Sequence, residues 1–408
     1  MCTEFPRDVV LFSTADWDHP FWTNKQHVAV HLARRGFRVL YIESLGLRRP
    51  TASPRDLDRM ARRLRRSVRS LRQVRENLWV GSPVAIPMHG SSLARWLNEK
   101  MLAAWVRRQC RRLRFSRPLV WTYNPLVQGV VDSLDPSLVV YHAVDDLRAA
   151  PHMPALAIKR AERDLAAKAD LVFATSRALE ARFRRDNSAT YFFSNVVDYE
   201  HFARACEPGP VPDELAAIPH PRLGFVGAIS AYKVDLPLIE AVARARPNWN
   251  WILIGQIGEG QPGTSIERLK LPNVHLLGPR DYERLPDYLR GLDVATIPAC
   301  RNAYTAAMFP MKFFEYLAAE LPVVVSGAPA LAEFSRAFSS ADSPAEFIER
   351  VEQILDGARA DRDYARNLAR QHTWEWRTSE MIGKLTEAWQ KRQTSHDRPD
   401  APDRRRAG

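Results

Sequence analysis

The chain has 408 residues, more than one compact domain of ordinary size usually holds, so we expect two domains. Hydrophobic residues make up 46% of the chain and charged residues 26%, proportions that exclude a chain disordered throughout. The net charge of +12 is compatible with nucleic acid, anionic lipid or an anionic small molecule as a partner, because the same long-range field attracts each of them.

The N-terminus and the cysteines exclude further classes of protein. The first residues contain no basic patch leading into a long apolar stretch, so no secretory signal is predicted. No later segment offers about 18 consecutive apolar residues, the length that a membrane-spanning helix requires. We therefore expect a cytoplasmic location. The cysteines form no CxxC pair, which argues against a zinc site and a disulfide framework.

Short apolar runs rich in Val, Ile, Leu and Phe recur between amphipathic segments, as is typical of buried parallel strands joined by crossover helices. In the first half we predict strands at Val9–Thr14, Arg38–Glu43, Leu119–Thr122, Leu138–His142, Leu171–Ala174 and Thr190–Phe193. In the second half we predict strands at Leu223–Val226, Trp251–Ile254, Val274–Leu277, Val294–Ile297 and Pro322–Val325. The pattern predicts an α/β protein with two doubly wound, Rossmann-like domains that face each other across a cleft.

A proline-rich segment, Glu207–Pro212, separates the two series of strands and predicts a linker. The expected parts of the chain are an N-terminal domain at 1–205, a linker at 206–221, a C-terminal domain at 222–375, a helix at 376–391 that returns to the N-terminal domain, and a disordered tail at 392–408. The tail is predicted from its polar, proline-bearing composition.

An arginine-rich insert at about 47–117 interrupts the N-terminal domain. Its residues 48–75 include eleven arginines and two acids. Apolar residues at three- and four-residue intervals predict a helix with an apolar face and a basic face between residues 55 and 75. Such a helix either packs on its own domain with the arginines in water, or docks on an anionic membrane surface. The residues on the basic face are Arg55, Arg59, Arg62, Arg66 and Arg69.

Four stretches carry a resemblance to a known family. They are Asp16–Gln26, Lys168–Ser176 with the following Asn195–Phe202, Leu223–Lys233, and Pro310–Val325. In this order they resemble the family 4 (group 1) retaining glycosyltransferases of the two-domain GT-B type. The opening stretch is similar to the subgroup of teichuronic acid and exopolysaccharide synthesis. The likeness runs from about Val9 to Trp389.

The last stretch indicates a site for the diphosphate of a nucleotide-sugar. A helix that opens at Pro310 has free backbone amides and the positive end of its dipole at its first turn, and Lys312 adds a charge. The resemblance implies that Glu315 binds the ribose hydroxyls, that Pro310 and Met311 belong to the donor site, and that Lys233 faces the phosphates.

On the N-terminal side, the segment that includes His142 and Asp145 runs from a strand into a polar loop. The family commonly places a histidine here, near the transferred sugar, so the resemblance implies this position for His142, or for Asp145 if the strand ends later. We expect further residues of the cleft, on the acceptor side, at Thr23, Asn24, Lys25, Tyr123 and Asn124.

Two positions depart from the family pattern. Ala307 stands where the family usually has an acid that contacts the donor sugar, and Ala228 stands where it usually has an arginine. Because of these departures the sequence does not identify the donor sugar. It is also compatible with a transferase homologue that has lost its activity.

Two other patterns are weaker. Asp16-Trp17-Asp18 matches the DxD metal motif of a different glycosyltransferase fold, but it follows the first strand, so we predict an acceptor-side loop and no metal site. The glycines of Gly255–Gly260 have the wrong spacing for a dinucleotide fingerprint, so a glycine-rich turn is predicted.

The sequence therefore predicts a metal-independent glycosyltransferase without a bound cofactor. Its expected substrates are a nucleotide-sugar, with UDP as the nucleotide, and a lipid-linked saccharide in cell-surface or exopolysaccharide synthesis. Retention of anomeric configuration is implied by the resemblance alone. We expect a peripheral position on the inner face of the cytoplasmic membrane, through residues 55–75. The alternative from another class is a nucleic-acid-binding protein, favoured by the charge but without a recognisable nucleic-acid motif.

Overall fold

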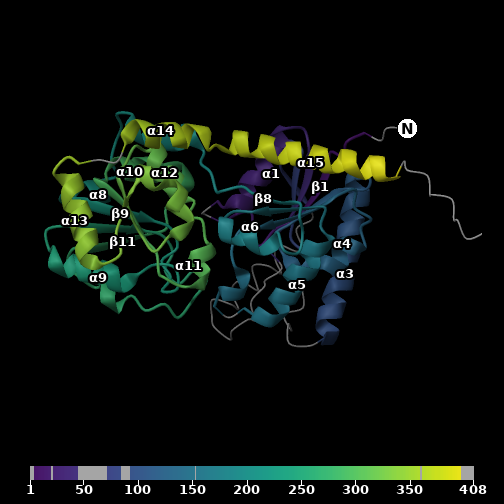
Figure 1. The fold of residues 1–408 in the computed structure, drawn as a ribbon, viewed down its shortest axis with the longest axis horizontal. Coiled ribbons are helices and arrows are strands. Elements are labelled where there is room, and N and C mark those ends of the chain that lie inside the picture. The colour runs from purple at the N-terminus through teal and green to yellow at the C-terminus, as the bar shows by residue number, and fades with distance from the viewer. Residues whose placement is uncertain are drawn as a thin grey trace, which may run out of the picture.

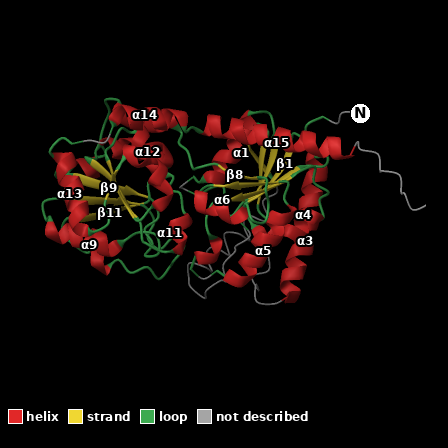
Figure 2. Ribbon diagram, viewed as in Figure 1, coloured by secondary structure: helices red, strands yellow, loops and turns green. Residues whose placement is uncertain are grey.

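The protein is described here by a computed structural model that covers residues 4–19, 22–44, 71–83, 92–151, 153–358 and 361–396. Figure 1 shows two α/β domains side by side, joined along one edge by the C-terminal helices. In each domain the strands form a central layer with helices on both faces (Figure 2). The predicted fold class is confirmed.

The N-terminal sheet has eight strands in the order β3-β4-β2-β1-β5-β6-β7-β8. Neighbouring strands are parallel except β3 and β4, which pair antiparallel at the edge. The strand order reverses between β1 and β5, which opens a crevice at their carboxyl ends. The strands are β1 (Asp8–Phe12), β2 (Arg38–Ile42), β3 (Arg72–Arg75), β4 (Leu78–Gly81), β5 (Leu119–Thr122), β6 (Val139–Ala143), β7 (Leu171–Ala174) and β8 (Thr190–Phe192).

Helices cover both faces of this sheet, because its strands are apolar on both sides and separate cores form above and below it. The described helices of this half are α1 (Asn24–Arg34), α3 (Ser92–Leu113), α4 (Gln128–Asp132), α5 (Ala155–Lys168) and α6 (Arg177–Phe183). The short helices α7 (Tyr199–Ala203) and α8 (Asp213–Ala216) follow. Phe202 and Leu215 from these two helices pack into the core of the C-terminal domain, so the chain has already crossed to that domain at α7.

The C-terminal sheet has six parallel strands in the order β11-β10-β9-β12-β13-β14, and its order reverses between β9 and β12. The strands are β9 (Arg222–Val226), β10 (Asn250–Ile254), β11 (Val274–Gly278), β12 (Val294–Pro298), β13 (Val323–Ser326) and β14 (Ser339–Ser340). The helices are α9 (Leu236–Ala245), α10 (Leu285–Arg290), α11 (Ala303–Ala307), α12 (Lys312–Ala318), α13 (Pro344–Leu355) and α14 (Arg362–Gln371).

The last helix, α15 (Trp374–His396), leaves the C-terminal domain and lies along the N-terminal one (Figure 1). Trp374, Met381 and Leu385 are buried in the N-terminal core, beside residues of β1 and α1. The helix continues to His396, beyond the start of the expected tail. No helix of the described ranges is both long enough and apolar enough to span a membrane.

All eleven predicted strands are present, each within two residues of the expected bounds. Strands β3, β4 and β14 were not predicted. Most of the basic helix predicted between residues 55 and 75 lies outside the described residues. The prediction is wrong for its C-terminal end, because residues 72–75 form the edge strand β3. Edge strands tolerate charged side chains, which hides them from a search for apolar runs.

Gly255 lets the loops after β9 and β10 approach each other closely beside the cleft. It has a φ of +157°, and a Cβ added there would lie 1.8 Å from the carbonyl oxygen of Gly227. Gly255→Ala is therefore expected to destabilise the protein by on the order of 3 kcal/mol, because backbone must move. Gly263→Ala is the control, since a Cβ there meets no atom within 4 Å. Urea unfolding measures both, and equal midpoints for the two variants would contradict this account of the loops.

Candidate active site between the domains

The two domains enclose a cavity of about 220 Å³. Its walls come from segments that follow strands of both sheets, together with helix α12. The strands are β1, β6 and β8 in the N-terminal domain and β9, β10, β11 and β12 in the C-terminal domain. Open α/β sheets bind ligands beyond the carboxyl ends of their strands, near the point where the strand order reverses. The cavity is therefore the candidate active site.

Helix α12 presents Lys312 and Glu315 to this cavity, and Pro310 and Met311 line it just before the helix. Lys312 and Glu315 are three residues apart and so lie on one face of the helix. On the buried side, the Tyr316 hydroxyl accepts a hydrogen bond from the backbone N–H that ends β9, at 2.8 Å. This bond fixes α12 against the sheet. The helix begins at Lys312, two residues later than predicted.

Burial acts on both charged groups of α12. It raises the pKa of Glu315 to about 7, against the opposing effect of the Lys312 charge. It lowers the pKa of Lys312 to about 8, and Glu315 partly offsets this shift. The Lys312 side chain lies against Gly227, where an added Cβ would be 3.0 Å from the lysine Cε. Both groups therefore change charge close to neutral pH. The close packing at Gly227 leaves the Lys312 side chain little space to move.

These shifts predict a narrow pH range for binding of an anionic nucleotide. Below pH 7 Glu315 takes up a proton and no longer accepts as a carboxylate, whereas above pH 8 Lys312 loses its charge. Affinity for UDP is therefore expected to be highest between pH 7 and 8 and to fall on both sides. Calorimetric titration from pH 5.5 to 9.5 checks this. Glu315→Gln is expected to remove the acidic limb, and an unchanged acidic limb in that variant would contradict the assignment.

Lys233 follows β9 and belongs to a second charged group in the cavity, which includes Asp145 from the N-terminal domain. The Lys233 Nζ lies 5.4 Å from the ring centroid of Tyr232 and 5.6 Å from that of Tyr304. Burial by itself lowers the pKa of Lys233, but Tyr232, Glu259 and Asp145 together raise it. This lysine therefore keeps its positive charge in the cavity.

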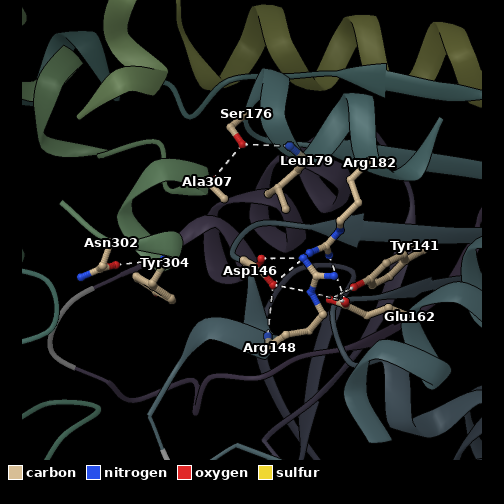
Figure 3. A network of polar contacts seen from close by, with 10 residues as sticks. All are labelled: Tyr141, Asp146, Arg148, Glu162, Ser176, Leu179, Arg182, Asn302, Tyr304 and Ala307. Carbon is tan, nitrogen blue, oxygen red and sulfur yellow. Dashed lines mark hydrogen bonds and ion pairs between the residues drawn. The ribbon is translucent and has the colours of Figure 1, made fainter. Parts of the chain in front are cut away.

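A network of ion pairs holds the loop that carries Asp145 (Figure 3). The Arg182 Nη1 lies 2.9 Å from Asp146 Oδ1, and its Nη2 donates to Glu162 at 2.9 Å. The Arg148 guanidinium pairs with the other oxygen of Asp146 at 2.8 Å. Because Asp146 is held on both sides, the backbone of the adjacent Asp145 is fixed at the mouth of the cavity.

The structure places three predicted residues behind the cavity wall: His142, Tyr123 and Asn124. The His142 ring is fully buried in β6, where it stacks on Tyr123 at 4.8 Å and accepts a hydrogen bond from Trp121 Nε1 at 3.3 Å. Burial lowers the pKa of His142 well below its ordinary value. Asn124 accepts a backbone N–H in the turn that follows β5. The sequence left His142 and Asp145 as alternatives for the residue near the transferred sugar. Asp145 lines the cavity and His142 does not.

Thr23, Asn24 and Lys25, expected on the acceptor side, line the same cavity as the donor residues. The Asn24 amide donates to the Asn195 side-chain oxygen at 2.6 Å, and the Asn195 amide donates to the Phe309 carbonyl at 2.7 Å. This chain of hydrogen bonds joins α1 to the segment before α12. The cavity is thus a single space to which both domains contribute.

The two alanines that depart from the family pattern lie in different surroundings. Ala228 lines the cavity, so no charge stands at that place. Ala307 instead packs into an apolar cluster of the N-terminal domain, and its carbonyl accepts a hydrogen bond from the Ser176 hydroxyl at 2.7 Å (Figure 3). A carboxylate at position 307 would be buried among apolar groups. The residue is a contact between the domains.

The possible metal motif lies outside the cavity lining. Asp18 forms an ion pair with Arg72 at 2.7 Å, and the backbone carbonyl of Asp16 accepts a hydrogen bond from Gln26. In the part of the chain that the structure describes, no group of three or more His, Cys, Asp or Glu side chains is arranged to hold a metal ion.

Among the polar residues of the cavity lining, four were not predicted: Asn195, Glu259, Tyr282 and Tyr304. Asn195 is the first residue of the family motif Asn195–Phe202, and this position in the motif could have identified it as a site residue. Glu259 lies in the glycine-rich turn after β10, where two positive-φ glycines flank it. The two tyrosines come from short helices, and the packing of the domains decides their position.

Comparison with known proteins agrees with this architecture. The profile of the family described as "Glycosyl transferases group 1" matches residues 220–357. TuaH of Bacillus subtilis (strain 168), whose name places it among the teichuronic acid biosynthesis glycosyltransferases, is 29% identical over 227 residues. The matched region covers 53% of this chain and 57% of TuaH, so the similarity spans little more than half of that relative.

Solved structures match nearly the whole chain at low sequence identity. HepE of Anabaena, in complex with UDP and glucose, has a TM-score of 0.66 and 17% identity, and the match covers 93% of this chain and 100% of HepE. Sucrose-phosphate synthase from Thermosynechococcus elongatus has a TM-score of 0.64 and 16% identity, with 96% and 99% covered. These likenesses show a shared fold. Residues 220–357 are therefore a glycosyl transferases group 1 domain, and the whole chain has the two-domain GT-B fold.

Proposed function

We propose that the protein is a glycosyltransferase that moves a sugar from a UDP-sugar to a lipid-linked saccharide in the synthesis of a cell-surface polysaccharide. The observation that carries the proposal is the combination of Glu315, Lys312 and Lys233 in one cavity between the domains. A carboxylate suits the ribose hydroxyls, and two cations suit a diphosphate. The UDP bound to HepE supports the choice of UDP as the nucleotide. The name of TuaH, which refers to teichuronic acid biosynthesis, supports a cell-surface polysaccharide as the product.

The proposed reaction breaks the bond between the anomeric carbon and a phosphate oxygen and forms a bond between that carbon and a hydroxyl oxygen of the acceptor, whose proton passes to the departing diphosphate. Negative charge then grows on the departing diphosphate and positive charge on the sugar, so the main requirement is preorganised cations around the diphosphate. Lys233 and Lys312 supply this charge, and we propose that the reaction needs no metal. Asp145 faces the sugar from the N-terminal side. Enclosure between the domains excludes water that would hydrolyse the donor. Retention of anomeric configuration is part of the proposal.

A thermal-shift screen with UDP-, GDP- and dTDP-sugars tests the donor class, because a ligand that binds the native state raises its apparent stability. We expect stabilisation by a UDP-sugar, and purified protein is expected to hydrolyse or transfer that sugar in the presence of EDTA. Stabilisation by no nucleotide-sugar would contradict the proposed function. Loss of activity in EDTA that manganese or magnesium restores would contradict metal independence.

The lipid-linked acceptor implies that the protein works at a membrane surface. Helix α3 supports this, because Trp96, Leu97 and Met101 are exposed on it and Arg108 and Arg111 continue the exposed face with positive charge. Aromatic and apolar side chains beside basic ones suit the interface of an anionic bilayer. The arginine-rich segment 55–70, which lies outside the described residues, belongs to the same insert at about 47–117 as this helix.

The membrane proposal predicts a loss of binding to anionic liposomes when four arginines of the insert are replaced. Each arginine near such a surface contributes about 1 kcal/mol, so the glutamine variant is expected to bind at least 100-fold more weakly at low salt. The substituted residues are Arg59, Arg62, Arg66 and Arg69. The control removes four exposed arginines of the C-terminal domain, Arg244, Arg268, Arg301 and Arg336. Equal co-sedimentation of both variants with the parent would rule out docking through the insert.

A further inference from the structure

Three lysines reach the cavity, and they come from both domains. Lys233 and Lys312 belong to the C-terminal domain, whereas Lys25 lies in the first turn of α1 in the N-terminal domain. Within the described ranges, none of the three forms an ion pair with a carboxylate at 4.0 Å or less. Lys25 is only 8% exposed, and among the described residues its amino group has no hydrogen-bond partner. Its ammonium is therefore buried at the cavity wall without a carboxylate or carbonyl contact from that part of the chain.

Lys25 and Lys233 line the same cavity, and the charge of Lys233 acts on Lys25. Burial lowers the pKa of Lys25, the charge of Lys233 lowers it further, and Asp145 opposes both effects. Asp145 also raises the pKa of Lys233. Two carboxylates of the cavity lining, Asp145 and Glu259, thus act on both ammonium groups, which come from opposite domains. A buried cation is costly unless an anion contacts it, so this arrangement favours an anionic ligand between the two lysines.

A fourth buried cation contacts Asn24, the neighbour of Lys25. The Arg377 guanidinium of α15 is 1% exposed and has no carboxylate partner among the described residues. It donates to Asn24 Oδ1 at 2.7 Å and to the Ser194 carbonyl at 2.8 Å. Burial lowers the pKa of Arg377 to about 10, so it remains charged at neutral pH. It adds to the positive potential at this wall of the cavity.

The backbone of Lys25 is held in place from both sides. Asn24 is fixed by Arg377 and by Asn195, and Thr23 caps the helix through a capping box with Gln26. The Lys25 Nζ lies 5.7 Å from the ring centroid of Tyr123, which sits behind it. The ammonium therefore needs little reorganisation to meet a ligand, and this is the condition under which a charge contributes most to binding.

We infer that Lys25 is a third diphosphate-binding residue, contributed by the N-terminal domain and opposing Lys233 across the phosphates. The inference rests on the proposed function and reassigns Lys25 from the acceptor side to the donor. It gives the N-terminal domain a direct contact with the diphosphate of the donor, so that the diphosphate itself joins the two domains. It also supplies a cation in a cavity where Ala228 brings none.

Titration of Lys25→Met with UDP, UMP and uridine tests the inference, because uridine contains the ribose but no phosphate. We expect UDP affinity to fall at least tenfold while uridine affinity stays within twofold of the parent. The thermal midpoint without ligand is expected to stay the same or rise, since methionine replaces a buried unpaired charge with an apolar side chain of similar size. Lys25→Arg is expected to keep most of the UDP affinity.

The matched control is Lys159→Met, which removes the same charge from an exposed position of the same domain and is expected to bind UDP like the parent. The inference is overturned if Lys25→Met binds UDP as tightly as the parent and instead raises the KM for the acceptor, or if uridine affinity falls as much as UDP affinity. If the parent itself binds no UDP, the proposed function fails and this inference with it. If Lys25→Met does not fold, the affinities of Lys25→Arg and Lys25→Gln for UDP decide.

Discussion

Glu315→Ala is expected to lower kcat/KM for the donor by roughly 10²–10⁴-fold while the protein remains folded. A carboxylate that accepts hydrogen bonds from two ribose hydroxyls makes two charge-assisted contacts, worth about 1.5–3 kcal/mol each. The variant has a second effect, because Glu315 raises the pKa of Lys312 and its removal leaves that lysine less charged at neutral pH. The loss is therefore expected to be largest at the alkaline end of the activity range.

Binding of uridine separates these two effects. Uridine affinity is expected to fall with Glu315→Ala above pH 7, where the parent carboxylate is charged, since it depends on the ribose contact alone. Glu267→Ala, at a solvent-exposed position of the same domain, is the control and is expected to behave like the parent. A Glu315→Ala protein that is folded and binds uridine and UDP like the parent would show that this carboxylate does not hold the nucleoside.

Lys312→Met is expected to reduce kcat by roughly 10²-fold or more, with a smaller effect on donor KM. The ammonium faces charge that grows on the diphosphate as the glycosidic bond breaks, so its interaction is stronger in the transition state than in the ground state. Methionine keeps the stem that packs against Gly227 and over the ring of Phe225, where Nζ now lies 4.8 Å from the ring centroid. Packing is therefore largely preserved, and the loss reports the charge.

Steady-state and single-turnover kinetics measure the Lys312 effect. The variant is also expected to lose the alkaline limb of the pH profile, because that limb is assigned to this group. A change in KM alone, with kcat at the parent value, would show that Lys312 binds the donor uniformly and does not stabilise the transition state.

The strands that carry the site could be predicted because both faces of each sheet are buried. A strand such as Leu171–Ala174 is apolar at every position and stands out from its polar surroundings. The edge strand β3 reads Arg-Gln-Val-Arg and has no such contrast, so it was missed. Motif order also located α12, since a helix of this kind has a local sequence signature.

The identity of the wall residues depended on register and on contacts between the domains. His142 lies inside β6, which continues to Ala143, so its ring faces the core, and the cavity is reached only at Val144 and Asp145. A shift of one residue in a strand moves a side chain to the other face, and sequence alone does not fix strand ends that closely. Tyr304 meets the cavity through tertiary contacts across the cleft, for which no local pattern exists.

The most direct test of the account is a crystal structure of the protein with UDP. We expect one nucleotide in the cavity between the domains. Both ribose hydroxyls are expected within hydrogen-bond distance of the Glu315 carboxylate, and the phosphates between Lys312 and Lys233. UDP bound elsewhere on the chain, or held in this cavity with its ribose away from Glu315, would contradict the assignment of the donor site.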